Sequence, residues 1–166
     1  MRNRARGLAV VEFCLVLPVM LVMMFGIIDF GSAILTRQVL INLSRETANL
    51  ASRGTPLADA LAAAQQSAAP LHLSTDGYVI LTEVYRDAAG ATTILHQIAQ
   101  GGRPGASRIG AGIGTKAVLP ATTVQIPPRG QTLFVAELYY QAAPITPLGK
   151  LLNFSFGDSY YDVAFF

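Results

Sequence analysis

The feature that most constrains this chain is an apolar run near its N-terminus. Residues 8–28 include no charged side chain other than Glu12, and three arginines lie within the first six residues. An α-helix needs about 20 predominantly apolar residues to cross a bilayer, and this run is long enough. No further basic residue occurs before Arg37, so the positive-inside rule predicts a cytoplasmic N-terminus and an exported remainder. The sequence therefore predicts a single-pass membrane protein.

The composition agrees with a membrane segment or a large self-association surface. Hydrophobic residues make up 52% of the chain and charged residues 13%, whereas soluble domains carry about a quarter charged residues. The net charge of +2 and the scattered basic residues give no basis for a nucleic-acid partner. The only cysteine, Cys14, lies inside the apolar run, which excludes an intramolecular disulfide.

Two simpler interpretations of the N-terminus explain less. A cleaved secretory signal has a shorter apolar core and a small-x-small cleavage site, and residues 27–31 offer no such site. A plain membrane anchor explains the length and the arginines but not Glu12, because a carboxylate costs about 2.5–3.5 kcal/mol near the centre of a membrane helix. Glu12 therefore either has a functional partner or extends toward the headgroups and the arginines.

The residues around Glu12 resemble the type IV prepilin signal. Arg6-Gly7 is followed by four small or apolar residues, then by Glu12-Phe13 and an apolar helix. In that family a prepilin peptidase cuts after the glycine, so the resemblance implies a processing site at Gly7 and Leu8. Glu12 would then be the fifth residue of the mature chain. Leu8 is larger than the alanine expected as the first mature residue in that family.

A longer string extends this resemblance to the TadE-like family, minor pseudopilins of the tight-adherence (Tad) pilus. Leu17-Pro18 follows Glu12-Phe13, and Phe25-Gly26 lies at the exit of the apolar run. The resemblance implies that Glu12 and Phe13 serve subunit assembly. After cleavage the new ammonium at Leu8 would enter the apolar layer, where the Glu12 carboxylate of a neighbouring subunit could pair with it.

The resemblance also implies partners and a location. The expected partners are the prepilin peptidase, another TadE-like or a TadF-like pseudopilin, the inner-membrane pilus platform and the major pilin. The expected location is the bacterial cytoplasmic membrane, with the protein either staying there or entering the pilus. The alternatives are a membrane-anchored extracytoplasmic binding module unrelated to pili and an anchored enzyme. Gly7 together with Glu12 favours the pseudopilin, because an anchor needs neither residue.

The helical pattern continues beyond the apolar run. Apolar residues recur at three- and four-residue steps as far as Leu50, and Arg53-Gly54 provides a glycine that can end the helix. We expect a leader at residues 1–7, a transmembrane and amphipathic helix at 8–54 and an exported α+β domain at 55–166. Thr55 is expected as the cap, and Pro56 as the first-turn proline, of a second, alanine-rich helix at residues 57–68.

The period changes to two from Asp76 onward, which is typical of strands. We expect a four-stranded antiparallel sheet packed on the amphipathic helix, with no prediction of strand order. A short apolar helix or surface loop is expected at residues 147–152 and an extended, mobile loop at 101–114. The expected strands cover residues 78–86, 92–98, 132–140 and 158–166.

No motif in the sequence predicts catalysis, a cofactor or a metal site. His72 and His96 lack metal-ligand spacing, and the glycine-rich stretch before Lys116 fails the phosphate-loop pattern because Thr115 precedes the lysine. Glu83 and Glu137 lie centrally in expected strands, and we expect them on a solvent-facing surface of the sheet rather than as paired carboxylates. The protein is therefore not expected to be an enzyme.

Overall fold

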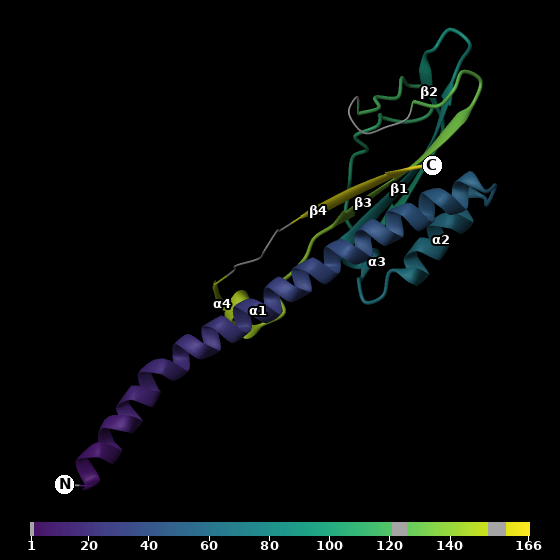
Figure 1. Ribbon diagram of the computed structural model, residues 1–166. Helices are drawn as coiled ribbons and strands as arrows, with labels where there is room; N and C mark the ends of the chain where they lie inside the picture. Colours follow the sequence, from purple (N-terminus) through teal and green to yellow (C-terminus); the bar gives the residue numbers. More distant parts are fainter. Residues whose placement is uncertain (1, 121–125, 153–158) are drawn as a thin grey trace. The chain divides into compact units, whose positions relative to one another are not determined.

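The structure is a computed structural model that describes residues 2–120, 126–152 and 159–166, with side chains described for 10–120, 126–151 and 159–166. It combines helices with one antiparallel sheet, which confirms the expected α+β class (Figure 1). The elements are α1 (Arg2–Ser52), α2 (Leu57–Ser67), α3 (Leu73–Asp76), β1 (Gly77–Arg86), β2 (Thr92–Gly101), β3 (Thr132–Tyr140), α4 (Pro147–Leu152) and β4 (Tyr160–Phe165).

The chain forms two units, residues 1–35 with 142–158 and residues 36–141 with 159–166. The predicted division into leader, helix and exported domain stays a prediction, because a folded conformation reports neither cleavage nor export.

Helix α1 is the longest element and has 51 residues. It already begins at Arg2, so residues 2–7 of the expected leader are helical as well. It ends close to the expected Arg53-Gly54, where Gly54 has a φ of 87°. A glycine in this left-handed conformation commonly ends a helix because it carries no Cβ.

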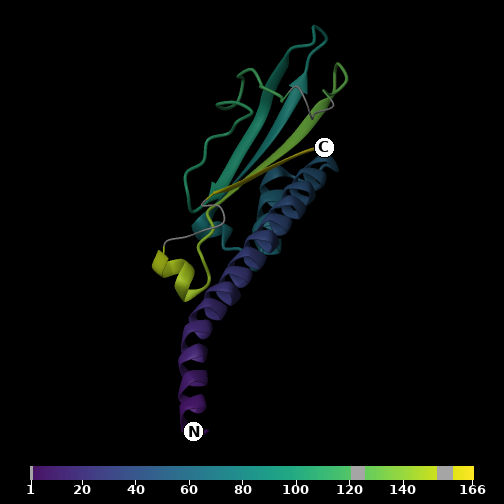
Figure 2. The ribbon, with the colours of Figure 1, turned by 60° about the vertical axis from the view of Figure 1, so that its left-hand side comes forward.

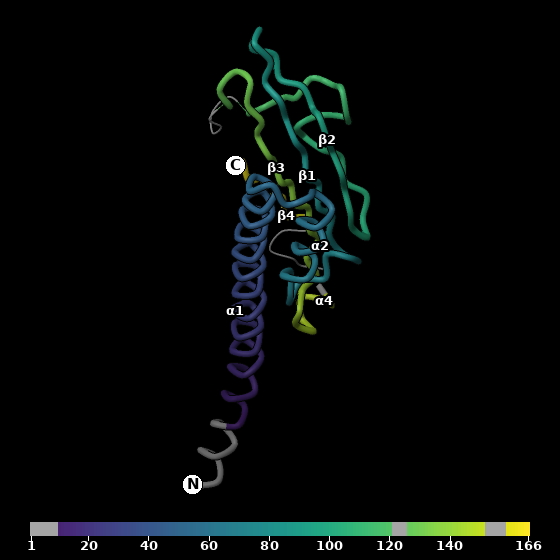
Figure 3. Tube along the Cα trace, turned by 90° about the vertical axis from the view of Figure 1, so that its right-hand side faces the viewer, coloured from purple at the N-terminus to yellow at the C-terminus, as the bar shows by residue number. Residues whose placement is uncertain are grey.

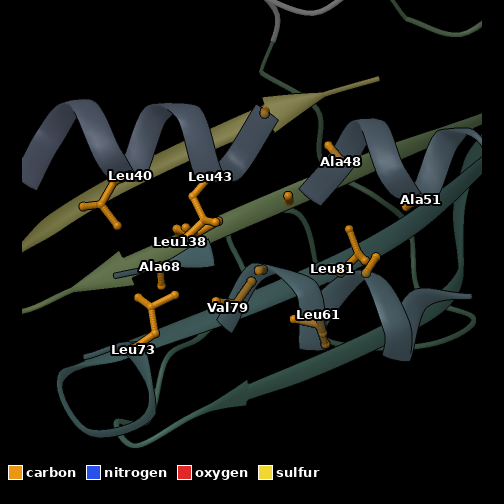
Figure 4. Packing of buried hydrophobic residues seen from close by; sticks show 14 residues of the cluster. Leu40, Leu43, Ala48, Ala51, Leu61, Ala68, Leu73, Val79, Leu81 and Leu138 are labelled. Carbon is orange, nitrogen blue, oxygen red and sulfur yellow. The ribbon is translucent and has the colours of Figure 1, made fainter. Parts of the chain in front are cut away.

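The second unit is built on the C-terminal part of α1. Buried side chains follow one face of the helix and pack, with those of α2, on β1 and β3 (Figure 4). The buried face starts at Thr36, so Ile34 and Leu35, which continued the sequence pattern, are exposed. The members of this core from the two helices are Leu40, Leu43, Ala48, Ala51, Ala60, Leu61 and Ala64, and Ala68 at the C-cap of α2 joins them.

Helix α2 lies beside this part of α1 and contributes to the same core (Figure 3). Its buried alanines, Ala60 and Ala64, leave room for close packing, as the alanine-rich sequence predicted. The expected capping was wrong, because Pro56 itself occupies the N-cap position and no side chain caps the helix. Thr55 is therefore not the cap.

The sheet has the strand order β2-β1-β3-β4, and all neighbouring strands are antiparallel. Strand β3 has the predicted bounds, whereas β2 continues past the expected Ile98 to Gly101. A bulge between Glu83 and Val84 shifts the pairing of β1 with β2. At the β4 edge, the Ser44 hydroxyl of α1 donates a hydrogen bond to the carboxylate of Asp162.

A long loop, residues 102–118, covers the sheet face opposite to α1 and α2 (Figure 2). Ile109 of this loop is 1% exposed and packs with Val84, Ile94 and Val135 in a second hydrophobic cluster. The loop was predicted as extended and mobile. It lacks regular structure as expected, but it packs against the sheet, because Ile109 and Ala117 bury apolar surface there.

Candidate functional site

All four predicted site residues lie on α1. Gly7 and Leu8 belong to its helical backbone, and their side chains lie outside the described part. Glu12 and Phe13 are exposed on the helix surface, and 62% of Phe13 is accessible. The structure therefore presents Glu12 and Phe13 on the outside of a helix, where another molecule can reach them.

The surface around Glu12 is almost wholly apolar. The exposed large side chains are Val10, Val11, Phe13, Leu15, Val16, Leu17, Val19, Met20, Leu21, Val22, Met23, Met24, Ile27 and Ile28. A contiguous apolar surface of this extent marks contact with a membrane or with other proteins. Within the described residues, α1 is the one helix long and apolar enough to cross a membrane, and its apolar window is not buried against the rest of the chain.

Glu12 is a carboxylate within this apolar surface. Among the side chains that the structure describes, none forms an ion pair with it. An unpaired carboxylate in a bilayer is costly, and acids at such positions are usually paired with another group. The arrangement therefore allows a cation from outside the described chain to pair with Glu12.

Asp29, immediately after the apolar run, forms a contact that sequence reasoning did not predict. Its Oδ1 accepts hydrogen bonds from the backbone N–H groups of Ile145 and Thr146, both at 3.0 Å. Its Oδ2 accepts one from the Thr146 hydroxyl at 2.6 Å. A carboxylate at the end of an apolar run was the available signal, but the sequence does not indicate its distant partners.

Glu137 contradicts the prediction of a solvent-facing position, because its side chain is 0% exposed. The loop of residues 102–118 covers it and supplies two hydrogen bonds, from the Ser107 hydroxyl and from the Arg108 backbone N–H at 2.8 Å. The Tyr161 hydroxyl of β4 donates a third at 3.0 Å. Buried carboxylates are tolerated when such donors satisfy them.

Two tyrosines and an arginine complete the surroundings of Glu137. The Arg108 guanidinium lies 3.8 Å from the centre of the Tyr161 ring, and the Tyr139 hydroxyl donates to the Ala106 carbonyl at 2.7 Å. Burial, and next the charge of Glu137, raises the pKa of the Tyr161 hydroxyl. Tyr161 therefore stays protonated at physiological pH and remains a donor to Glu137.

Glu83 and Glu137 do not form a carboxylate pair. In the pairing of β1 with β3, Glu83 lies opposite Phe134, and the two side chains share one face of the sheet. Phe134 is three residues before Glu137 on β3, and side chains an odd number of residues apart on a strand point to opposite faces. Glu83 and Glu137 therefore lie on opposite faces of the sheet. Glu83 instead contacts His96, with 2.8 Å between its Oε2 and the histidine Nδ1. Within the described residues, no group of three or more His, Cys, Asp or Glu side chains is arranged to hold a metal ion.

The sequence contained one signal for the burial of Glu137. Residues 133–138 form a nearly continuous apolar run in which Glu137 is the only polar residue. Such a run is typical of a strand that is covered on both faces, whereas a strand with a solvent face alternates. Ser107 could not have been identified as a partner, because the covering loop has no periodic pattern.

Comparison with known proteins gives one family. Residues 7–49 match the model of the TadE-like protein family. No curated protein and no solved structure matches the chain. The matched segment contains Gly7, Leu8, Glu12 and Phe13, and it extends along α1 into the second unit. Residues 7–49 of this chain are therefore TadE-like, which confirms the resemblance drawn from the sequence.

Proposed function

We propose that this protein is a minor pseudopilin, anchored in the bacterial cytoplasmic membrane, that assists Tad (Flp) pilus biogenesis and adhesion. The match of residues 7–49 to the TadE-like family carries the proposal. Its partners are the prepilin peptidase, a second TadE-like or TadF-like pseudopilin, the inner-membrane platform and the major pilin. Its role is structural and not enzymatic.

The exposed apolar surface of α1 supports this role in two ways. Before assembly, lipid covers it as it would cover any membrane-spanning helix. During assembly, a neighbouring α1 replaces part of the lipid, and the neighbour's N-terminal ammonium pairs with Glu12. The pairing removes two isolated charges from a low-dielectric layer at once, which gives the contact its register.

Processing distinguishes this proposal from a membrane-anchored binding module. In cells with the prepilin peptidase, we expect the mature chain to begin at Leu8 and to lack the seven-residue leader. In cells without the peptidase the chain should keep Met1. Intact-mass measurement of the membrane-extracted protein checks both results. A full-length chain in peptidase-positive cells would contradict processing and would leave only the anchor.

Topology is the second expectation. Because three arginines precede the apolar run, a reporter fused after Phe166 should be active only outside the cytoplasm. Alkaline phosphatase, which is active only when exported, and a cytoplasmically active reporter at the same position form a matched pair. Phosphatase activity without activity of the second reporter is the expected result. The reverse pattern would overturn the proposed orientation.

A further inference from the structure

The bonds to Asp29 fix a short segment at a defined position along α1. We call residues 144–151, which include the first five residues of α4, the interfacial segment. Its Thr146 is 4% exposed, and the hydroxyl that donates to Asp29 also accepts the Gly149 backbone N–H at 3.1 Å. A Cβ on Gly149 would lie 2.5 Å from Asp29 Oδ2, so glycine permits this close approach.

The position of Asp29 indicates what surrounds the interfacial segment. Asp29 is the first charged residue after Glu12 and directly follows the apolar run at residues 8–28. If that run crosses the bilayer, then the bonds to Asp29 hold the segment where the hydrocarbon ends. Backbone N–H groups near hydrocarbon need partners inside the protein. The Asp29 carboxylate is the hydrogen-bond partner of the Ile145 and Thr146 backbone N–H groups, which lie just before the start of α4.

The outer surface of the interfacial segment suits a lipid headgroup region. Ile145 is 60% exposed and Leu151 is 81% exposed, while Lys150 is exposed between them in sequence. Exposed apolar side chains beside a lysine are typical of elements that lie in the membrane interface, where the apolar groups reach the acyl chains and the cation contacts anionic headgroups.

We propose that the interfacial segment lies in the outer surface of the bilayer, with Ile145 and Leu151 inserted among the lipids and Asp29 fixing its depth. This inference rests on the proposed membrane insertion of α1. It adds a second lipid contact to that of α1. This second contact includes Ile145, which lies 116 residues after Asp29 in the chain. The contact restrains the rotation of α1 about its axis, because a helix with an element attached on one side presents a fixed side to the lipid surface.

Depth-dependent quenching in vesicles tests the inference on the full chain. In a Cys14→Ser background, a single cysteine replaces Leu151, Met20 or Ile113 and carries an environment-sensitive fluorophore. Met20 reports the apolar run, and Ile113, which is 66% exposed on the loop of residues 102–118, is the matched exposed apolar control. The vesicles contain phosphatidylcholine and phosphatidylglycerol, with nitroxide either at the headgroup or deep in the acyl chain.

The expected result has three parts. The Met20 probe is quenched by the deep nitroxide, the Leu151 probe loses most of its fluorescence with the headgroup nitroxide, and the Ile113 probe is quenched by neither. Asp29→Ala and, independently, Gly149→Ala should reduce quenching of the Leu151 probe without changing that of the Met20 probe. Both variants act on the same contact, one by removing the acceptor and the other by steric conflict.

Different failures overturn different claims. If the Met20 probe is quenched but the Leu151 probe is not, or if the Ile113 probe is quenched equally, the interfacial segment has no specific lipid contact and the anchored pseudopilin still stands. If the Met20 probe is not quenched, both the membrane anchor and the interfacial segment are wrong. If the Asp29 and Gly149 variants leave quenching at Leu151 unchanged, Asp29 does not set its depth.

Discussion

Replacing Glu12 by glutamine should nearly abolish piliation while the protein accumulates normally in the membrane. Glutamine costs less to place in an apolar layer than an ionised carboxylate, so insertion should not suffer. Association should weaken because the ammonium of the neighbouring subunit loses its partner. Removing one member of a buried ion pair costs about 3–5 kcal/mol, which corresponds to roughly a hundredfold weaker association or more.

The measurements are the protein level in membranes, co-purification of the partner pseudopilin and counts of surface pili. Glu46→Gln provides a matched control, because it makes the same change at an exposed position of the same helix. Glu12→Asp should be intermediate, since its shorter side chain reaches the ammonium less well. If Glu12→Gln cells assembled pili as well as the parent, Glu12 would be no more than a carboxylate that reaches toward the headgroups.

Helices and strands could be predicted from the sequence where their apolar residues follow a regular pattern. The apolar run and its amphipathic continuation predicted the end of α1 to within two residues but not its start at Arg2, whereas α2 and β3 have the expected bounds to within one residue. The end of α1 was equally accessible, because Gly54 adopts a conformation that other residues avoid.

The contacts of Asp29 and Glu137 could not be predicted in this way. Each acid binds a segment without periodicity, and each contact joins residues far apart in the chain, such as Asp29 with Thr146 and Glu137 with Ser107. A hydrogen bond between distant loops depends on the fold as a whole. The sequence suggested a solvent face for Glu137 because polar strand residues usually point to water, and this rule failed because the loop of residues 102–118 covers that face.

The burial of Glu137 leads to the largest stability effect that we expect in this protein. Glu137→Ala removes the acceptor for the Ser107 hydroxyl, the Arg108 N–H and the Tyr161 hydroxyl, and it leaves a cavity. These hydrogen bonds are partly buried, and each donor left without a partner costs up to about 1–3 kcal/mol. Rearrangement of the loop will recover part of this loss, so we expect the free energy of unfolding to fall by about 3–5 kcal/mol.

Thermal unfolding of the full chain in detergent, followed by circular dichroism, should show a melting temperature lower by roughly 10 °C or more. Glu83→Gln is the matched control, because Glu83 pairs with His96, whose side chain is 65% exposed, and such pairs contribute less than about 1 kcal/mol. Trypsin gives a second readout, since Arg108 lies in the loop that Glu137 holds. Cleavage after Arg108 should be faster in Glu137→Ala than in the parent or in Glu83→Gln. A Glu137→Ala protein that melted and resisted trypsin like the parent would show that the loop is held by apolar packing of Ile109 and Ala117 alone.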